Sequence, residues 1–504
     1  MIEPFSNDVL WIVIVGFIMA FVLAFGIGAN DVANSFGTSV GSKVLTIRQA
    51  CYLATVFEIA GAVLIGYKVS DTIRKGILEV TMYENQENEL MLGMFASLIG
   101  SSLLLLGATF FGLPVSATHS IVGATVGFSL VCRGLDGINW NTLWTIVGSW
   151  FLSPVMSGVI SVVLFLLIRW LILSAPNPVV PGLLFLPIFY GLTILINIFS
   201  IVHDGSSLLY FDRIPWWGAL TASLCAGALV SLVVQLIVVP RMRNSIEEST
   251  DGLSFNGVKK CDDVYIENNV GKQSITMTPS EDKELANGNT NITNGKESAT
   301  QDGMTGQDNP AYTANPEDIG ANPTETKQVE ADDPPEVNKL FSFLQILTAC
   351  FASFAHGGND VSNAIGPLIA LWMIYTEGSV QQKSEAPLYI LFYGGVGISI
   401  GLWIWGRRVI KTIGEDLTKI TPSTGFTIEI GAAFTVLLAS KIGLPISTTH
   451  CKVGSVVFVG WASTTKQGVD WKLFRNIIGA WVLTVPIAGG LSAASIAALR
   501  AVAL

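Results

Sequence analysis

The chain has 504 residues, of which 50% are hydrophobic and only 13% are charged, and its mean hydropathy is +0.55. A soluble domain carries about 25% charged residues, so this composition excludes a solvated enzyme, a nucleic-acid binder and a disordered chain as descriptions of the whole. The net charge of −10 is local, because residues 241–337 hold eight basic and nineteen acidic residues and the rest of the chain has a balance of +1. These values describe a polytopic membrane protein.

Continuous apolar runs recur along the chain, and a bilayer crossing needs about 20 such residues. They predict an all-α protein with about 10–12 transmembrane helices. The runs are 10–29, 48–67, 90–111, 141–172, 183–202, 216–239, 340–356, 387–406, 425–441 and 472–499. Because the run 141–172 is too long for one straight crossing, we expect it to be strongly tilted or broken near Pro154.

Shorter pieces rich in Gly, Ser and Thr lie between these runs. They are too polar for ordinary membrane spans and too apolar for loops, so we expect re-entrant hairpins or half-helices, which suit irregular backbone at membrane depth. The pieces are 31–42, 112–130, 361–375 and 443–461.

Residues 241–337 differ from the rest in being rich in Asn, Thr, Glu, Asp and Pro. Such a composition cannot bury enough apolar surface to fold alone, so the sequence predicts a disordered acidic loop. This loop separates a transmembrane half at 1–240 from a second one at 338–504. Arg241 and Arg243 directly follow an apolar run, and the positive-inside rule then places the loop in the cytoplasm.

The most informative feature of the sequence is a duplication of two polar motifs. GANDVAN at 28–34 recurs as GGNDVSN at 357–363, with an offset of 329, and GLPVSATH at 112–119 recurs as GLPISTTH at 443–450, with an offset of 331. Two similar membrane halves are typical of transporters, whose substrate site lies near the midplane where the repeats meet. The parity of the crossings between equivalent helices decides whether the repeats are inverted, and hydropathy does not settle that parity.

The first motif places an amide and a carboxylate at the end of an apolar helix, after glycines that lower the cost of unwinding. Amide, carboxylate and carbonyl oxygens suit a hard cation, and an ionisable group within a span indicates function. The alternative is that the aspartates cap the next helical piece. The candidate cation ligands are Asn30, Asp31, Asn359 and Asp360. Asn34 and Asn363 lie one turn further on and are expected to face the same cavity.

The second motif starts a new helical piece after Pro114 and Pro445, with hydroxyl side chains in its first turn. Helix N-termini offer free N–H groups and a positive dipole end, which suit phosphate. The alternative is ordinary capping and small-residue packing between membrane helices. The candidate residues for binding an anionic substrate are Ser116, Thr118, Ser447, Thr448 and Thr449, together with Asn34 and Asn363.

Two glutamates and three histidines complete the candidate site. Glu58 and Glu429 lie within apolar spans without a basic neighbour in sequence, so each is either a cation ligand or coupling residue, or a carboxylate paired elsewhere in the fold. His119, His356 and His450 lie in or beside the duplicated motifs. His119 and His450 either donate to phosphate or lock a hairpin.

Together, the doubled GANDVAN-like and GLP(V/I)S(A/T)TH motifs resemble those of the inorganic phosphate transporter (PiT) family, in particular its animal-type sodium-dependent symporters. The resemblance covers about 10–240 and 338–504. It implies inverted repeats, a multi-pass protein of the plasma membrane, and cotransport of inorganic phosphate with sodium ions. It also implies functional roles for Glu58 and Glu429, which lie in the family's TVFE and FTIE contexts. No cofactor is implied, because sodium is a cotransported substrate.

Phosphate would meet two carboxylates in this site without a lysine or arginine inside either motif. Like charges repel strongly at low dielectric constant, so bound sodium must screen them, and we expect sodium-coupled phosphate uptake by alternating access. A proton-coupled carrier, a carrier of another oxyanion and a passive anion channel are the alternatives within transport. An intramembrane hydrolase using Ser116, His119 and Asp31 lacks the G-x-S-x-G elbow, and a purely structural role leaves the motifs without a use. We therefore expect no enzyme activity and no nucleic-acid partner; a homodimer in the bilayer is left open.

Overall fold

The computed structural model describes residues 3–246, 333–406, 420–463 and 469–503. One compact unit contains Met1–Ser249 and Glu330–Leu504, so both halves of the chain belong to the same unit. Within the described ranges, helices are joined by turns and short loops and no strand is present. Residues 247–332, most of the predicted acidic loop, lie outside the described residues.

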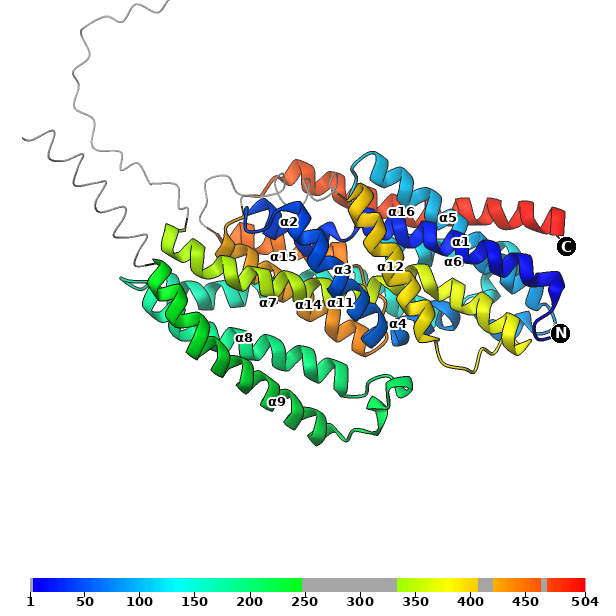
Figure 1. The fold of residues 1–504 in the computed structure, drawn as a ribbon. Coiled ribbons are helices and arrows are strands. Elements are labelled where there is room, and N and C mark those ends of the chain that lie inside the picture. Colours follow the sequence, from blue (N-terminus) through cyan, green and yellow to red (C-terminus); the bar gives the residue numbers. More distant parts are fainter. Residues whose placement is uncertain (1–2, 247–332, 407–419, 464–468, 504) are drawn as a thin grey trace, which may run out of the picture. The chain divides into compact units, whose positions relative to one another are not determined.

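Long apolar helices make up this unit (Figure 1). The main helices of the first half are α1 (Asn7–Asn30), α2 (Ala33–Gly41), α3 (Ile47–Ile65), α4 (Tyr67–Asp71), α5 (Glu87–Phe110), α6 (Ala117–Arg133), α7 (Trp140–Ile168), α8 (Val179–Val202) and α9 (Trp216–Val233). Those of the second half are α11 (Pro335–Glu377), α12 (Leu388–Trp405), α14 (Pro422–Lys441), α15 (Thr448–Ala462) and α16 (Trp471–Ala503). In the described ranges, 10 helical stretches are long and apolar enough to cross a membrane, which confirms the prediction of an all-α, multi-pass membrane protein.

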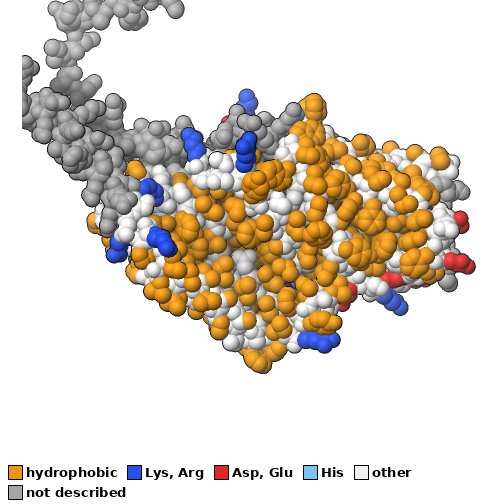
Figure 2. Space-filling view, viewed as in Figure 1, with side chains coloured by type: hydrophobic (Ala, Val, Ile, Leu, Met, Phe, Trp, Pro, Cys, Tyr) orange, Lys and Arg blue, Asp and Glu red, His pale blue; other side chains and the backbone are white. Residues whose placement is uncertain are grey.

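Hydrophobic side chains cover the middle of the molecular face drawn in Figure 2. Large apolar residues are freely exposed there and elsewhere, for example Phe151 at 74% and Trp461 at 76%. In water such a surface would mark an interface. On helices that cross a bilayer it is the surface that lipid chains contact.

The first copy of the Asn-Asp motif interrupts its helix, and the second copy does not. Helix α1 ends at Asn30 and α2 begins at Ala33, whereas α11 continues through its own motif to Glu377. The predicted separate piece at 361–375 is therefore wrong. Its glycines serve close packing instead, since a Cβ on Gly357 would lie 2.2 Å from the backbone oxygen of Glu58.

Of the other predicted irregularities, a break in α7 is absent, whereas those at the two GLP sequences are present. Helix α7 runs unbroken past Pro154 and continues into a π-helical segment (Arg169–Leu173). Of the two alternatives expected for this run, the break near Pro154 is excluded, and the tilted crossing stays a prediction. By contrast, each GLP sequence forms a turn between two helices, α5 and α6 in the first half and α14 and α15 in the second. Gly112 and Gly443 have positive φ values of 68° and 71° in these turns, a conformation that favours glycine.

Each half packs onto the other in a reciprocal manner. A Cβ on Gly123 of α6 would lie 2.5 Å from the backbone oxygen of Val485 in α16, and a Cβ on Gly454 of α15 would lie 2.3 Å from that of Pro154 in α7. Both glycines and both carbonyls are separated by 331 residues, the offset of the second motif. Equivalent helices of the two halves therefore exchange partners, as a two-fold relation between the halves requires.

Helices α8 and α9 stand apart from this duplication. They lie side by side along one edge of the helices in Figure 1, following α7 in the chain. Their sequence is not repeated in the described residues of the second half. This pair therefore adds asymmetry to an otherwise duplicated unit.

Candidate functional site

Asn30 and Asn359 hold the GLP turns in place. The Nδ2 of Asn30 donates to Thr109 Oγ1 at 3.0 Å and to the Leu113 carbonyl at 2.9 Å, and its Oδ1 accepts from Val115 N at 3.2 Å. Asn359 forms a hydrogen bond of 3.1 Å with Ser440 Oγ, whose position corresponds to Thr109. Asn30 thus joins the end of α1 to the turn before α6, and Asn359 joins the middle of α11 to the last turn of α14.

The two aspartates lie at the N-termini of the helices that follow these turns. Asp31 Oδ2 accepts a hydrogen bond from Ala117 N at 3.3 Å, at the start of α6. Asp360 Oδ2 accepts one from Thr448 Oγ1 at 2.5 Å, at the start of α15. Both side chains are 1% exposed, and the positive ends of two helix dipoles stabilise their charge. Asp31 Oδ1 is buried without a hydrogen-bond partner among the described residues.

Asn34 and Asn363 reach across the boundary between the halves. Asn34 Nδ2 donates to Thr449 Oγ1 at 2.9 Å, and Asn363 Nδ2 donates to Thr118 Oγ1 at 3.2 Å. The Oδ1 atoms of both asparagines are buried and have no hydrogen-bond partner in the described ranges. In each half, the second asparagine of the Asn-Asp motif thus contacts a threonine of the GLP motif in the other half.

Ser116 and Ser447 act as helix N-caps. Each hydroxyl accepts a hydrogen bond of 3.2 Å from the backbone N–H three residues later, at His119 and His450. Ser116 Oγ also lies 2.8 Å from His119 Nδ1. These contacts fit the capping alternative raised by the sequence.

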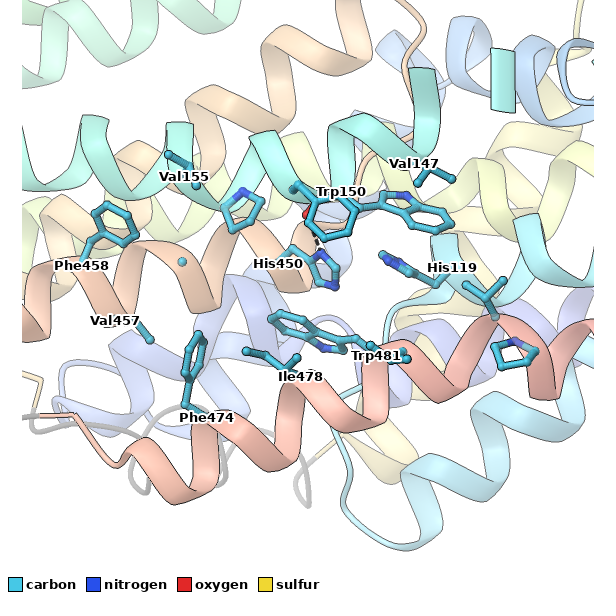
Figure 3. A pocket seen from close by; sticks show the side chains of 16 residues that line it. His119, Val147, Trp150, Val155, His450, Val457, Phe458, Phe474, Ile478 and Trp481 are labelled. Atoms are coloured by element: carbon cyan, nitrogen blue, oxygen red, sulfur yellow. Dashed lines mark hydrogen bonds between the residues drawn. The ribbon is translucent and has the colours of Figure 1, made fainter. Parts of the chain in front are cut away.

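His119 and His450 lie on the side of this cluster that faces α7 and α16. Figure 3 shows the two rings between Trp150 and Trp481. The His119 ring centroid is 3.7 Å from that of Trp150, and the same distance separates His450 from Trp481. The aromatic groove beside them has a volume of about 580 Å³ and mainly apolar walls. This setting fits a role in locking the two hairpins together.

Glu58 is joined to Asp360 through His356, a connection that crosses between the halves. Ser353 Oγ donates to Glu58 Oε1 at 2.8 Å, and His356 Nδ1 lies 2.8 Å from Glu58 Oε2. The other ring nitrogen of His356 lies 2.8 Å from Asp360 Oδ2. The residue at the corresponding position of the first half is Ile27, so only the Asp360 side has this histidine bridge.

Glu429 lies in a different cluster, formed with α2, α11 and α15. It accepts hydrogen bonds from three hydroxyls, those of Thr38, Ser39 and Thr348, and the last two lie at 2.7 and 2.5 Å. Lys452, which is 1% exposed, donates to Thr38 Oγ1 at 3.2 Å. A buried carboxylate thus shares a hydroxyl network with a buried ammonium group, which lowers the cost of burying either charge.

Sequence reasoning missed the partners of both glutamates because they come from helices distant in the chain. The one available signal was Lys452, a lysine inside the apolar piece 443–461. Reciprocal packing also shows that the glutamates are not copies of each other. A Cβ on Gly61 would meet the Phe354 carbonyl, and a Cβ on Gly401 would meet the carbonyl of Phe25, the residue equivalent to Phe354. Gly61 therefore corresponds to Gly401, and the residue three positions before it, Glu58, corresponds to Ile398.

A model of the Phosphate transporter family matches residues 27–492. The chain belongs to this family. The family consists of transporters, and the chain is therefore a transporter and not an enzyme.

Relatives match along nearly the whole chain. Sodium-dependent phosphate transporter 1-B of Danio rerio is 42% identical, covering 99% of this chain and 96% of the relative. Sodium-dependent phosphate transporter 1 of Homo sapiens is 40% identical over 99% of this chain and 97% of its own. A solved structure described as the sodium-dependent phosphate transporter has a TM-score of 0.74 and 36% identity, covering 98% of this chain and 100% of that chain.

Proposed function

We propose that the protein is a symporter that carries inorganic phosphate into the cell together with sodium ions, by alternating access of one central site. The names of its relatives support the substrates. The reciprocal packing of the halves supports an inverted-repeat transporter, in which a substrate site lies where the repeats meet. The site is buried in this conformation, so transport requires the halves to move apart on one side at a time.

The observation that carries this proposal is the pair of hydrogen bonds that cross between the halves, from Asn34 to Thr449 and from Asn363 to Thr118. They bring Asp31 and Asp360 together with the N-termini of α6 and α15. Hard oxygen ligands for sodium and N–H groups for phosphate therefore meet in one buried place.

The same contacts suggest how sodium and phosphate are coupled. Without cations, each aspartate occupies the helix N-terminus that would otherwise bind the anion. Sodium ions held by Asn30, Asp31, Asn359 and Asp360 would draw these carboxylates away and neutralise them. The first turns of α6 and α15, with Thr118, Thr448, Thr449, Asn34 and Asn363, would then bind phosphate, and Ser116 and Ser447 would hold those turns as caps.

Glu58 and Glu429 are assigned to coupling in this scheme. Glu58 connects to Asp360 through His356, and Glu429 connects α2 to α11 and α15 through hydroxyls. Each carboxylate therefore links an ion-binding helix to a neighbour that must shift when the site opens. His119 and His450 are assigned to the packing of the two hairpins.

We further propose that the protein lies in the plasma membrane with the 241–337 loop in the cytoplasm. Arg241 and Arg243 follow the apolar stretch that begins at Trp216, which fits the positive-inside rule. An epitope tag inserted in the loop should react with antibody only after cells are permeabilised. Light scattering on the purified protein would distinguish a monomer from the homodimer that the sequence leaves open.

The deciding experiment is uptake of labelled phosphate into proteoliposomes containing the full chain. An inward sodium gradient is compared with equal choline, with and without excess sulfate, for the wild type, Asp31→Asn and Asp360→Asn. We expect uptake to require sodium and to ignore sulfate, and each variant to lose at least about tenfold, because the amide lacks the negative charge that neutralises a bound sodium ion. Asp136→Asn, which removes an exposed carboxylate, is the matched control.

Normal sodium-dependent uptake by both aspartate variants would contradict the assignment of the ion ligands. Equal uptake in choline under a proton gradient would establish the proton-coupled alternative. Competition by sulfate would broaden the substrate to oxyanions in general.

A further inference from the structure

A second cavity lies away from the central site, where the helical stretch Trp216–Ile246 ends and α11 begins. It has a volume of about 690 Å³, which lies within the usual range for ligand pockets. One wall comes from residues 238–246 and the other from residues 338–346. These two segments flank the 247–332 stretch in the chain, and Lys339 Nζ donates to the Ser245 carbonyl at 3.1 Å, which ties the walls together.

The rim of this cavity is polar and basic. Arg241 and Lys339 are exposed and line it together with Ser245, Asn338 and Ser342. Asp333 and Glu336, which precede the second wall in the sequence, do not line the cavity, and Asp333 Oδ2 accepts a hydrogen bond from Ser423 N at 3.4 Å. In Figure 2, Lys and Arg side chains gather toward the end of the molecule where α11 begins, and Asp and Glu side chains gather toward the opposite end.

The rest of the lining is apolar. These apolar residues, which we call the floor, are Val238, Met242, Ile246, Phe343 and Ile346. Leu236 and Ile237, on the turn before the cavity, are 66% and 46% exposed. This stretch is apolar enough to cross a membrane, so acyl chains are its natural surroundings. The cavity thus combines two basic groups with an apolar surface in one lining.

We propose that this cavity binds an anionic phospholipid of the cytoplasmic leaflet, with its phosphate between Arg241 and Lys339 and an acyl chain along the apolar floor. Basic pockets between membrane helices on the cytoplasmic side are suited to such headgroups. A soluble phosphate ester shares the headgroup chemistry but would leave the apolar floor unused. The leaflet follows from the proposed orientation, whereas the binding itself does not depend on it.

Native mass spectrometry of the purified full chain tests this proposal, with dioleoyl phosphatidylserine and dioleoyl phosphatidylcholine as probes. The wild type should bind phosphatidylserine at least about tenfold more tightly than phosphatidylcholine. The double variant Arg241→Gln/Lys339→Gln should lose about 25-fold in phosphatidylserine affinity, since each basic residue near an anionic surface contributes roughly fivefold. The control Arg243→Gln/Lys472→Gln also removes two exposed basic residues but leaves the cavity lining intact.

Three results would overturn the proposal. Equal retention of the two lipids by the wild type would remove the preference for an anionic headgroup. An equal loss in the control variant would show general surface attraction. Displacement of phosphatidylserine by an equal concentration of soluble glycerophosphoserine would show an anion site that does not use the acyl chain. The first and third measurements use only the wild type, so they stand even if a variant folds poorly.

Discussion

In the proposed scheme, the serines of the second motif position the backbone that binds phosphate and are not themselves ligands. Ser116 and Ser447 each use their hydroxyl to satisfy an N–H of the first helical turn. That turn is the part of the helix assigned to phosphate. A residue with the right chemistry for binding can therefore serve by positioning the groups that bind.

Replacing Ser447 separates these two roles. Ser447→Ala removes the cap and should lower stability by about 1 kcal/mol, while Ser447→Thr should retain most of it. We expect the KM for phosphate to stay within about twofold of the wild type in both variants. Thermal unfolding in detergent and proteoliposome uptake measure the two quantities, and a tenfold rise in KM at unchanged stability would instead make the hydroxyl a ligand.

Asp204, in the loop after α8, forms a surface tie near the second GLP turn. It pairs with Lys68, its backbone oxygen accepts from Lys441 Nζ at 3.1 Å, and it lies near His203. The hydrogen bond from Lys68 lowers the pKa of Asp204 below its ordinary value, assisted by the nearby charges of Lys68, Lys441 and His203. The carboxylate is thus ionised in the folded protein at neutral pH.

A lowered pKa means that the tie stabilises the fold above the ordinary carboxyl pKa and is lost as the pH falls through the lower, folded value. We expect Asp204→Asn to cost up to about 1 kcal/mol, because the pair is exposed. The cost should be constant between about pH 5 and 8, begin to fall near the ordinary carboxyl pKa of about 4, and vanish only below the lower, folded value. Thermal unfolding of both proteins across this range measures it, and a difference that grows toward low pH would contradict the sign.

At the scale of the elements, the structure depends on close contacts between helices of opposite halves. Gly123 lies against α16, and Gly454 lies against α7, at distances that leave no room for a methyl group. Gly148 and Gly479, on α7 and α16 themselves, face open space and are likewise separated by 331 residues. The duplicated helices therefore contain one glycine pair in close helix contacts, Gly123 and Gly454, and another without neighbouring atoms, Gly148 and Gly479.

Alanine substitutions should distinguish these pairs. Gly123→Ala or Gly454→Ala forces the helices apart and should destabilise the protein by about 1–3 kcal/mol. Gly148→Ala or Gly479→Ala should be neutral or stabilise by up to about 1 kcal/mol, because alanine favours the helix and meets nothing. The thermal midpoints of the four variants check this order, and equal effects in both pairs would show that helix propensity alone is responsible.

At the scale of the whole molecule, both halves belong to one compact unit that leaves out residues 250–329. The compact unit ends at Ser249 and resumes at Glu330. Lys339 and Ser245, one on each side of the gap, are already in contact. The chain can therefore be rejoined there without disturbing the halves.

Deleting residues 250–329 and inserting a short Gly/Ser linker tests that independence. We expect sodium-driven phosphate uptake per molecule to stay within about twofold of the wild type, since no candidate site residue lies in the deleted segment. Uptake normalised to reconstituted protein is the measurement. A loss above tenfold in a variant with normal thermal stability would assign the segment a role in transport.

The sequence allowed the helical membrane class and the duplicated motifs to be predicted, because the length of apolar runs and the recurrence of a motif can be read directly from the order of residues. It did not allow the unbroken α11 to be predicted, because Gly357 looks alike whether it loosens a helix or lets α3 approach. Nor did it reveal that His356 joins Glu58 or that Lys452 accompanies Glu429. Those partners meet only through the packing of helices that lie far apart in the chain.

The crossed bonds from Asn34 to Thr449 and from Asn363 to Thr118 have a consequence for how such a gene can change. A copied segment is normally free to drift apart from its twin. Here each copy supplies the partner that the other copy needs, so neither can be lost or exchanged alone. A substitution at Asn34 is therefore best compensated at Thr449, hundreds of residues away, and not at Thr118 in its own copy. Substitutions at these contacts are therefore expected to occur together in the two halves.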